Sequence, residues 1–232
     1  MGVSLARKFD LLVFDLDGTL IDNRDAIREN FNYVLHALNY QKIRSEQIDS
    51  MIGASLPDMF SRAAPGIKND EAHKMAEMYR DRYNEVGHVG ISFLEGVPDI
   101  LSDLRKAGFK LAIATTKVER TAVPLLKKIN LYKHFDFVAG GREDLRSKPN
   151  PDMLNYVMKS LAVGPKLTAM IGDTPLDVGM ARNAGVYSIA VLSGVRLGIT
   201  SLDDIQASKP NLTIESLKEL QKHVSTKQKV KS

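Results

Sequence analysis

The sequence predicts an α/β protein in which a Rossmann-like parallel sheet, covered by helices on both faces, is interrupted early by a helical insert. The first observation is that, from Gly96 onward, short apolar runs alternate with segments of helical spacing, which is the pattern of βαβ units. The second is that Gly108 and Gly185 follow two of these segments, where a left-handed residue commonly ends a helix. The third is that residues 22–89 show helical spacing without a strand-like run.

The first predicted element is a strand over Phe9–Phe14, because a short apolar run that ends in a glycine turn is typical of a buried parallel strand. We expect residues 1–21 and 93–232 to form the α/β core and residues 22–92 to form the helical insert. Since the insert leaves the core directly after the first strand and returns before the second, it is placed to cover the end of that first strand.

The later core elements follow from the same alternation of apolar runs and helical spacing, and right-handed βαβ connections would place them around one parallel sheet. The predicted strands after the first are Lys110–Ala114, Phe135–Ala139, Thr168–Ile171, Tyr187–Leu192 and a short edge strand, Asn211–Ile214. The predicted helices are Asp99–Ala107, Thr121–Ile129, Pro151–Leu161, Leu176–Ala184, Leu202–Ala207 and Ser216–Val224.

Composition excludes several classes of protein. The 232 residues are 44% hydrophobic and 26% charged, which are ordinary proportions for a globular protein and exclude wholesale disorder. The sequence contains no cysteine, which excludes disulfide scaffolds, cysteine zinc sites, iron–sulfur clusters and thiol catalysis. No apolar run approaches the ~20 residues that a membrane span requires, and residues 1–8 lack the apolar stretch of a signal peptide. We therefore expect a cytoplasmic protein with no membrane partner.

The net charge of +4 lies in one segment of the chain. Residues 218–232 carry five lysines and one acid, and the other 27 of the 32 basic residues are matched by 27 of the 28 acids. A neutral body offers no track for a phosphate backbone, so we expect no nucleic-acid partner. A polar, lysine-rich segment at a chain end is typical of a solvated tail, and we expect residues 218–232 to be frayed.

Polar side chains gather at the ends of the predicted strands. Because the carboxyl ends of parallel strands meet at one edge of a sheet, where ligands bind in such folds, we expect these side chains to converge. The set consists of Asp15 and Asp17 after the first strand, Thr115, Thr116 and Lys117 after the second, Lys148 before the helix that leads to the fourth, and Asp173 and Asp177 after the fourth.

Carboxylates, hydroxyls and an ammonium at one sheet edge are suited to phosphoryl transfer. Carboxylate oxygens are the ligands that Mg²⁺ prefers in proteins. A carboxylate can also attack phosphorus and form an aspartyl-phosphate, while a second carboxyl protonates the leaving oxygen and later takes a proton from water. A lysine and a hydroxyl stabilise the negative charge that the phosphoryl oxygens carry. The sequence therefore favours an enzyme of phosphate chemistry.

These residues form four motifs, Asp15-Leu-Asp-Gly-Thr-Leu20, Thr115, Lys148 in a Lys-Pro-x-Pro context, and Gly172-Asp173-x-x-x-Asp177. In order and spacing, the chain resembles the haloacid dehalogenase superfamily. The resemblance covers nearly the whole chain, because residues 22–92 look like the small helical cap domain of that superfamily. The segments Ile52-Gly-Ala-Ser-Leu-Pro57 and Ala114-Thr-Thr-Lys117 resemble the branch of phosphoglycolate phosphatases and related pyrophosphatases.

The resemblance implies a role for each motif residue. Asp15 would be the nucleophile and Asp17 the general acid and base. Thr115, helped by Thr116, would bind the phosphoryl oxygens, and Lys148 would hold phosphate and nucleophile together. The ligands of Mg²⁺ would come from Asp15, the backbone carbonyl of Asp17, and Asp173. Outside that ligand set, Asp177 would orient the lysine or a metal-bound water.

The expected activity is that of a Mg²⁺-dependent phosphatase, monomeric or homodimeric, acting on a small phosphorylated metabolite such as phosphoglycolate. A β-phosphoglucomutase-like phosphosugar mutase shares all four motifs and stays open, and an inorganic pyrophosphatase is the other open alternative. A receiver-like signalling module is disfavoured, since receivers are about half this length and lack a cap. A dehalogenase is disfavoured because those relatives lack an acid like Asp17, and phosphonate hydrolysis would need a cap lysine in a recognisable setting. Lys117 is either a site residue or a surface charge at a helix start.

Overall fold

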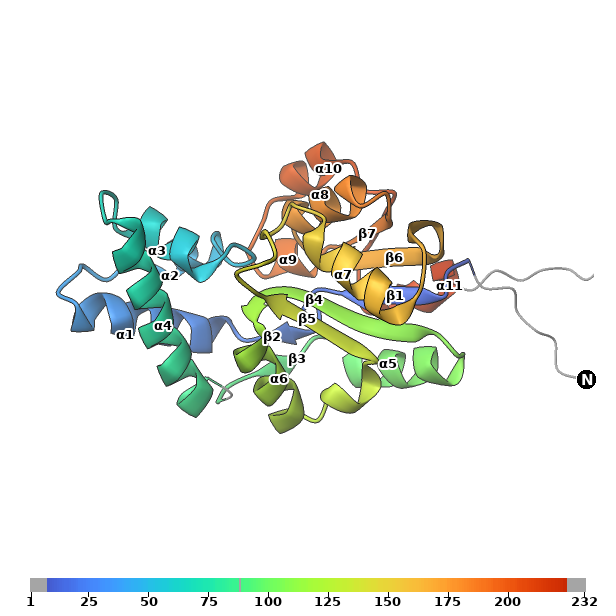
Figure 1. Ribbon diagram of the computed structural model, residues 1–232, viewed down its shortest axis with the longest axis horizontal. Helices are drawn as coiled ribbons and strands as arrows, with labels where there is room; N and C mark the ends of the chain where they lie inside the picture. Colours follow the sequence, from blue (N-terminus) through green and yellow to red (C-terminus); the bar gives the residue numbers. More distant parts are fainter. Residues whose placement is uncertain (1–7, 88, 225–232) are drawn as a thin grey trace, which may run out of the picture.

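A computed structural model describes residues 8–87 and 89–224 of the protein. Its core is a parallel sheet with the strand order β5-β4-β1-β6-β7-β8, so the first strand lies in the middle and the chain winds outward in both directions (Figure 1). This arrangement confirms the predicted fold class. The strands are β1 (Leu11–Phe14), β4 (Lys110–Val118), β5 (Phe137–Gly141), β6 (Thr168–Gly172), β7 (Tyr187–Val191) and β8 (Leu212–Ile214).

Helices cover both faces of the sheet because alternate side chains of its buried strands point to opposite sides. In β1, Leu12 and Phe14 pack in one hydrophobic cluster with α5, α6 and α11. Leu11 and Val13 pack in the other with α7 and α8. The helices of the core are α5 (Val97–Lys106), α6 (Glu119–Lys128), α7 (Asp152–Leu161), α8 (Pro175–Asn183), α9 (Ser193–Arg196), α10 (Leu202–Ser208) and α11 (Leu220–Val224), with short 3₁₀ turns at Tyr132–His134, Pro165–Leu167 and Leu217–Glu219.

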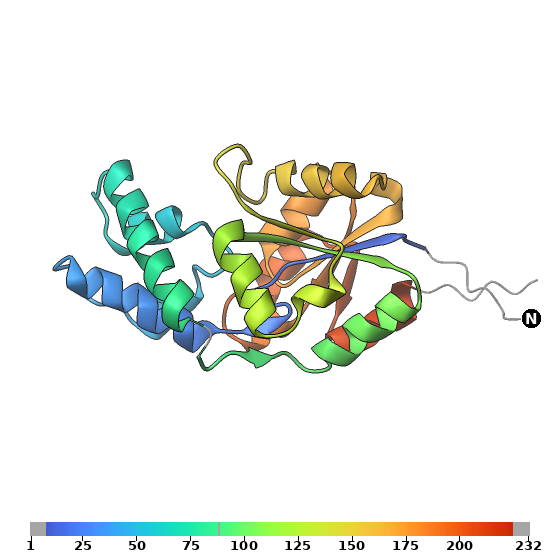
Figure 2. The same ribbon diagram turned by 60° about the horizontal axis from the view of Figure 1, so that its bottom comes forward.

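A separate group of helices stands beyond the carboxyl ends of the strands (Figures 1 and 2). The group, which we call the cap, packs around a stacked pair of rings, Phe31 and Phe60, whose centroids lie 4.2 Å apart. Tyr79 meets Phe60 edge-on at 6.5 Å. The cap helices are α1 (Arg24–Ala37), α2 (Ser45–Asp49), α3 (Leu56–Ala63) and α4 (Asn69–Val86).

Two short strands join the cap to the core. These strands, β2 (Ile21–Asp22) and β3 (Ser92–Phe93), pair in antiparallel register, so that the segment leaving the core and the segment returning to it run side by side. This pair could not be predicted from the sequence, because strands of two residues are too short to show a periodicity. The pair fixes where the cap begins and ends relative to β1.

Each predicted strand of the sheet differs from the observed one in at least one bound, by one or two residues in total in four of them, including the first, which begins at Leu11, and by more in the other two. The strand predicted as Lys110–Ala114 continues to Val118, with a shift of pairing register between Ala114 and Val118. Its last residues include threonines and a valine, which favour extended backbone although they interrupt the apolar run. The strand predicted as Phe135–Ala139 begins at Phe137, because the backbone N–H of Phe135 still closes a turn onto the carbonyl of Tyr132.

The prediction of a frayed tail is wrong for residues 218–224. Leu217, Leu220 and Val224 are buried in the main hydrophobic cluster, and the carbonyl of Val224 accepts a hydrogen bond from the backbone N–H of Lys8. The lysines between these apolar positions made the segment look like solvent-exposed tail, although its helical spacing also predicted a helix. Residues 225–232 lie outside the described part of the chain. No helix in the described ranges is long and apolar enough to cross a membrane.

Shortening the chain so that it ends at Ser225 is expected to leave kcat and the melting temperature unchanged, since the removed residues are polar and lysine-rich. In contrast, Leu220→Ala should lower the free energy of unfolding by about 2–5 kcal/mol, because it leaves a cavity at a fully buried position. Urea unfolding of both proteins, with the exposed Lys222→Ala as control, measures the difference. A truncated chain that loses kcat, or a Leu220→Ala protein as stable as the parent, would contradict this division of the C-terminal segment.

Candidate active site

The order of the strands brings two acids of the predicted site together. Asp15 directly follows β1, and its backbone N–H donates to the carbonyl of Ile171 in the neighbouring strand β6. Asp173 directly follows β6. Thr115 lies on β4, the other neighbour of β1, and is buried. The carboxyl ends of three adjacent strands therefore present these side chains at one edge, as the sequence predicts.

Lys148 connects the loop before α7 to this edge. Its Nζ lies 2.6 Å from Oδ1 of Asp15 and 2.6 Å from Oδ1 of Asp177, and all three side chains are buried. The other oxygen of Asp177, Oδ2, accepts hydrogen bonds from the backbone N–H and the hydroxyl of Thr174 at the start of α8. Both oxygens of Asp177 are thus engaged, and this acid holds the ammonium of Lys148 against Asp15.

Asp173 is the third buried carboxylate. Its Oδ1 accepts a hydrogen bond of 2.6 Å from the hydroxyl of Thr19, while its buried Oδ2 has no hydrogen-bond partner among the described residues. Gly18, at a φ of +87°, lies so close that an added Cβ would sit 2.4 Å from this Oδ2. Only glycine allows both this backbone conformation and this approach. The arrangement leaves one oxygen of Asp173 available to a ligand.

The cluster carries more negative than positive charge. Oxygens of Asp15, Asp173 and Asp177 lie within 4.8 Å of one another, and Lys148 is the one cation in hydrogen-bond contact with them among the residues described. Burial raises the pKa of Asp15 to about 7, although the ammonium of Lys148 opposes the shift. Burial and the two neighbouring acids hold the pKa of Asp173 well above its usual range. Three buried acids with one lysine therefore fit a divalent cation, which would relieve their mutual repulsion.

The ammonium of Lys148 stays charged in this setting. Burial by itself would lower the pKa of Lys148, but the carboxylates of Asp15 and Asp177 raise it above its ordinary value. The site thus keeps a fixed positive charge next to Asp15. A point charge at this position suits the stabilisation of phosphoryl oxygens.

Asp17 points away from the acid cluster and toward the cap. Its Oδ1 accepts a 2.6 Å hydrogen bond from Nδ2 of Asn23, and its Oδ2 lies 3.4 Å from Nζ of Lys117. Both partners also meet Tyr83 of α4: Asn23 bonds to the Tyr83 hydroxyl at 2.8 Å, and Nζ of Lys117 lies 4.3 Å from the ring centroid. The side chain of Lys117 is 9% exposed, so the surface interpretation of this lysine is wrong.

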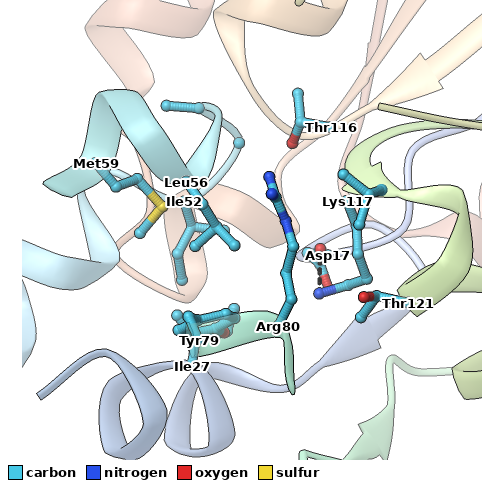
Figure 3. A pocket seen from close by; sticks show the side chains of 13 residues that line it. Asp17, Ile27, Ile52, Leu56, Met59, Tyr79, Arg80, Thr116, Lys117 and Thr121 are labelled. Atoms are coloured by element: carbon cyan, nitrogen blue, oxygen red, sulfur yellow. Dashed lines mark ion pairs between the residues drawn. The ribbon is translucent and has the colours of Figure 1, made fainter. Parts of the chain in front are cut away.

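A cavity that is partly open to solvent lies between the cap and the core, with Asp17 in its wall (Figure 3). Its wall on the cap side is largely apolar, and its wall on the core side is polar, which is typical of pockets for small molecules. Thr116, predicted to assist phosphate binding, lines it directly, whereas Thr115 lies buried behind, with its hydroxyl accepting from the backbone N–H of Lys117. The cavity is lined by Asp17, Thr116, Lys117, Val118 and Thr121 of the core and by Ile27, Ile52, Gly53, Ala54, Leu56, Met59, Tyr79 and Arg80 of the cap.

The sequence of this site and its surrounding fold match a known protein family. Residues 12–191 match the haloacid dehalogenase-like hydrolase family. The chain belongs to this family. The match begins in β1, ends in β7 and includes every site residue named above. A receiver-like signalling module is therefore excluded, and the protein is a hydrolase, consistent with a phosphoric monoester hydrolase.

Curated relatives of this hydrolase are named as phosphatases and pyrophosphatases. It is 30% identical to a phosphoglycolate phosphatase of Vibrio parahaemolyticus, over 90% of this chain and 93% of the relative. It is also 30% identical to the pyrophosphatase PpaX of Halalkalibacterium halodurans, over 92% of this chain and 95% of the relative. The crystal structure of a predicted phosphatase from Clostridium acetobutylicum superposes with a TM-score of 0.82 at 27% identity, covering 92% and 97% of the two chains.

The structure assembles the predicted residues into two groups. Asp15, Lys148, Asp173 and Asp177 form the buried cluster, while Asp17 and Thr116 face the cavity. The predicted carbonyl ligand of Asp17 stays a prediction, and the carboxylate of Asp17 is not part of the acid cluster. Four residues of the site have no role predicted from the sequence, and only the first of them stands inside a recognised motif: Thr19, Asn23, Tyr83 and Arg80.

Proposed function

We propose that this hydrolase is a Mg²⁺-dependent phosphatase that transfers the phosphoryl group of a small metabolite to Asp15 and then to water. The observation that carries the proposal is the buried cluster of three carboxylates around one lysine, at the same strand ends as Asp17 of the cavity wall. Its unpaired Oδ2 of Asp173 and its surplus of negative charge support a cation there. When bound, Mg²⁺ would be held by Asp15 and Asp173 and would neutralise charge on the phosphoryl oxygens.

In the first step, a carboxylate oxygen of Asp15 attacks phosphorus and the bond to the leaving oxygen breaks. Lys148, held by Asp177, contacts Asp15 and is in place to balance the charge of the transferred group. Asp17, which faces the cavity, delivers a proton to the leaving oxygen. The products of this step are the free alcohol and an aspartyl-phosphate on Asp15.

In the second step, water attacks the phosphorus of the aspartyl-phosphate, and Asp17, now a carboxylate, takes the proton. The bond between phosphorus and Asp15 breaks, which restores the enzyme and releases inorganic phosphate. Asn23 and Lys117 hold Asp17 from two sides, so the acid is fixed in direction while the cap lies over the core. This contact links proton transfer to the closed position of the cap.

A small substrate is favoured by the position of the cap. The cavity lies between Asp17 and four apolar side chains of α1, α3 and the segment before α3, which leaves space for a compact leaving group. The names of the relatives point to phosphoglycolate or pyrophosphate as candidates. We propose that hydrolysis takes place in the cytoplasm on such a metabolite, with the protein acting as a monomer or homodimer.

The proposal is tested by measuring phosphate release with Mg²⁺ from phosphoglycolate, pyrophosphate, glucose 1-phosphate and a phosphopeptide. We expect kcat/KM for at least one of the first two to exceed that for the phosphopeptide by a large factor. A higher value for the phosphopeptide would contradict the small-substrate argument. Isomerisation of glucose 1-phosphate without release of phosphate would replace the phosphatase with a phosphosugar mutase.

Removal of divalent cations is expected to abolish turnover, and Mg²⁺ should restore it. Ca²⁺ should inhibit, because it accepts more ligands at longer distances and can engage both oxygens of Asp15, which takes the attacking lone pair out of line. The measurement is steady-state turnover after dialysis against chelator, with each cation added alone and then Ca²⁺ added against Mg²⁺. Comparable turnover with Ca²⁺ alone would refute this geometric argument.

A further inference from the structure

We propose that Arg80 of the cap determines specificity by binding a second anionic group on the leaving part of the substrate. The inference rests on the proposed phosphatase function and deepens it, since it names the substrate class: a small phosphate compound with another negative charge close to the transferred phosphoryl group.

The position of Arg80 carries the first part of the argument. Its side chain leaves α4 and runs through the middle of the cavity, with the guanidinium directed toward Thr116 (Figure 3). Ile52 and Leu56 of the cap lie on one side of the Arg80 side chain. Asp17 and Lys117 lie on the opposite side. The side chain is only 12% exposed. Its Nε is buried and has no hydrogen-bond partner among the described residues. A guanidinium therefore enters the space where a leaving group would lie, with hydrogen-bonding capacity left over.

The charges around Arg80 carry the second part. Its one acidic partner within residues 8–87 and 89–224, Glu77, also pairs with Arg120 of α6, so two guanidinium groups share one carboxylate. Among the described residues that line the cavity, Asp17 is the one acid, and it is engaged by Lys117. Around Arg80, two guanidinium groups thus outnumber the one carboxylate that pairs with them. Arg120 can keep Glu77 paired when Arg80 binds a ligand.

The chemistry of the cavity selects the ligand. A guanidinium binds carboxylate and phosphate through two parallel hydrogen bonds, which a neutral hydroxyl cannot match. The apolar side chains beside Arg80 suit a short carbon chain rather than a sugar ring rich in hydroxyls. The shared chemistry is a second anion, supplied either by the carboxylate of a phosphorylated hydroxy acid or by the second phosphate of pyrophosphate.

Arg82 provides a matched control on the same helix. Its Nε is also buried without a partner among the described residues. Its guanidinium, however, lies 4.1 Å from the ring of Tyr33 and pairs with Glu29 at 2.8 Å, and it does not line the cavity. The two arginines therefore lie on the same helix and both lack a partner at Nε, but only the side chain of Arg80 lines the cavity.

The experiment compares the wild type, Arg80→Gln and Arg82→Gln on phosphoglycolate, pyrophosphate and 2-hydroxyethyl phosphate. The last compound has the size of phosphoglycolate with a hydroxymethyl group in place of the carboxylate. We expect Arg80→Gln to raise KM for phosphoglycolate, pyrophosphate or both about 10- to 100-fold, with kcat changed by less than about threefold. KM for 2-hydroxyethyl phosphate should change by less than about threefold. Arg82→Gln should change none of these values. The anionic substrate that is affected identifies the second anion.

Three results would overturn the inference: an unchanged KM for both phosphoglycolate and pyrophosphate, an equal rise for 2-hydroxyethyl phosphate, or a wild type that hydrolyses only 2-hydroxyethyl phosphate. In all three the phosphatase function would stand. If no compound releases phosphate, the proposed function fails instead. Calorimetric binding of phosphoglycolate and pyrophosphate to wild type and Arg80→Gln then tests whether Arg80 binds a second anion. Binding weakened by Arg80→Gln supports the anion site, whereas equal or absent binding overturns it. Arg80→Lys, which keeps the charge, should recover part of the lost affinity.

Discussion

Asp15→Asn is expected to lower kcat by roughly four orders of magnitude or more, because an amide oxygen cannot serve as the nucleophile that forms the acyl phosphate. The protein should still fold. The substitution is nearly isosteric, the amide oxygen can still accept the hydrogen bond from Lys148, and burial already disfavours a charge at this position. The melting temperature should therefore stay the same or rise in the absence of Mg²⁺.

The matched control is Asp10→Asn, at the opposite end of the first strand, one residue before β1 begins. This substitution also exchanges an aspartate for an asparagine next to the central strand, but it lies far from the carboxyl edge, and we expect full turnover. Steady-state kinetics on the best substrate of the panel, together with thermal unfolding, measures both proteins. An Asp15→Asn protein that retains a hundredth of the activity or more would remove Asp15 from its proposed role.

Lys148→Met is expected to cause the largest loss of stability among single substitutions at the site. It leaves Asp15 and Asp177 buried without their ammonium, and breaking a buried ion pair in this way costs about 3–5 kcal/mol. For a protein of this size that corresponds to a melting temperature lower by about 10 °C. Turnover should fall as well, by roughly a thousandfold, because the charge beside the phosphoryl group is lost.

Mg²⁺ distinguishes this account of Lys148 from a simple packing role. If the loss comes from unbalanced carboxylates, saturating Mg²⁺ should recover much of the melting temperature of Lys148→Met, whereas an exposed lysine, Lys106→Met, should change it by little with or without Mg²⁺. Calorimetric scans with chelator and with Mg²⁺ provide the test. A Lys148→Met protein as stable as the parent under both conditions would show that the cluster is not governed by its charge balance.

The core of the fold could be predicted from the sequence because its strands and helices follow two clear periodicities. What the sequence missed depends on contacts instead. The extension of β4 to Val118 comes from pairing with Gly141 of β5, and β2 and β3 exist only because the two connections to the cap lie side by side. The segment around Leu220 folds because three of its apolar residues, Leu217, Leu220 and Val224, reach the core, although its lysines resemble those of the residues that follow.

The site residues also fall into those that the strand pattern predicts and those that depend on contacts between distant segments. Asp15, Asp173 and Thr115 could be predicted because the ends of adjacent parallel strands meet, whatever the rest of the chain does. Asn23, Tyr83 and the cavity position of Arg80 could not. Helical spacing indicates which face of α4 is buried, but it does not say that this face meets Lys117 at the end of β4 and, through Asn23, the side chain of Asp17. Substrate selection depends on those cap contacts.

The most direct test of the central claim is to trap the phosphoryl group on the enzyme. The protein is mixed with the best substrate and Mg²⁺, quenched in acid within one turnover and reduced with borohydride, which converts an aspartyl-phosphate into homoserine. Peptide mass spectrometry then locates the reduced residue. Our account predicts homoserine at position 15 in wild type and at no position in Asp15→Asn. Homoserine at another aspartate, or phosphate release at full rate with no trapped residue, would contradict it.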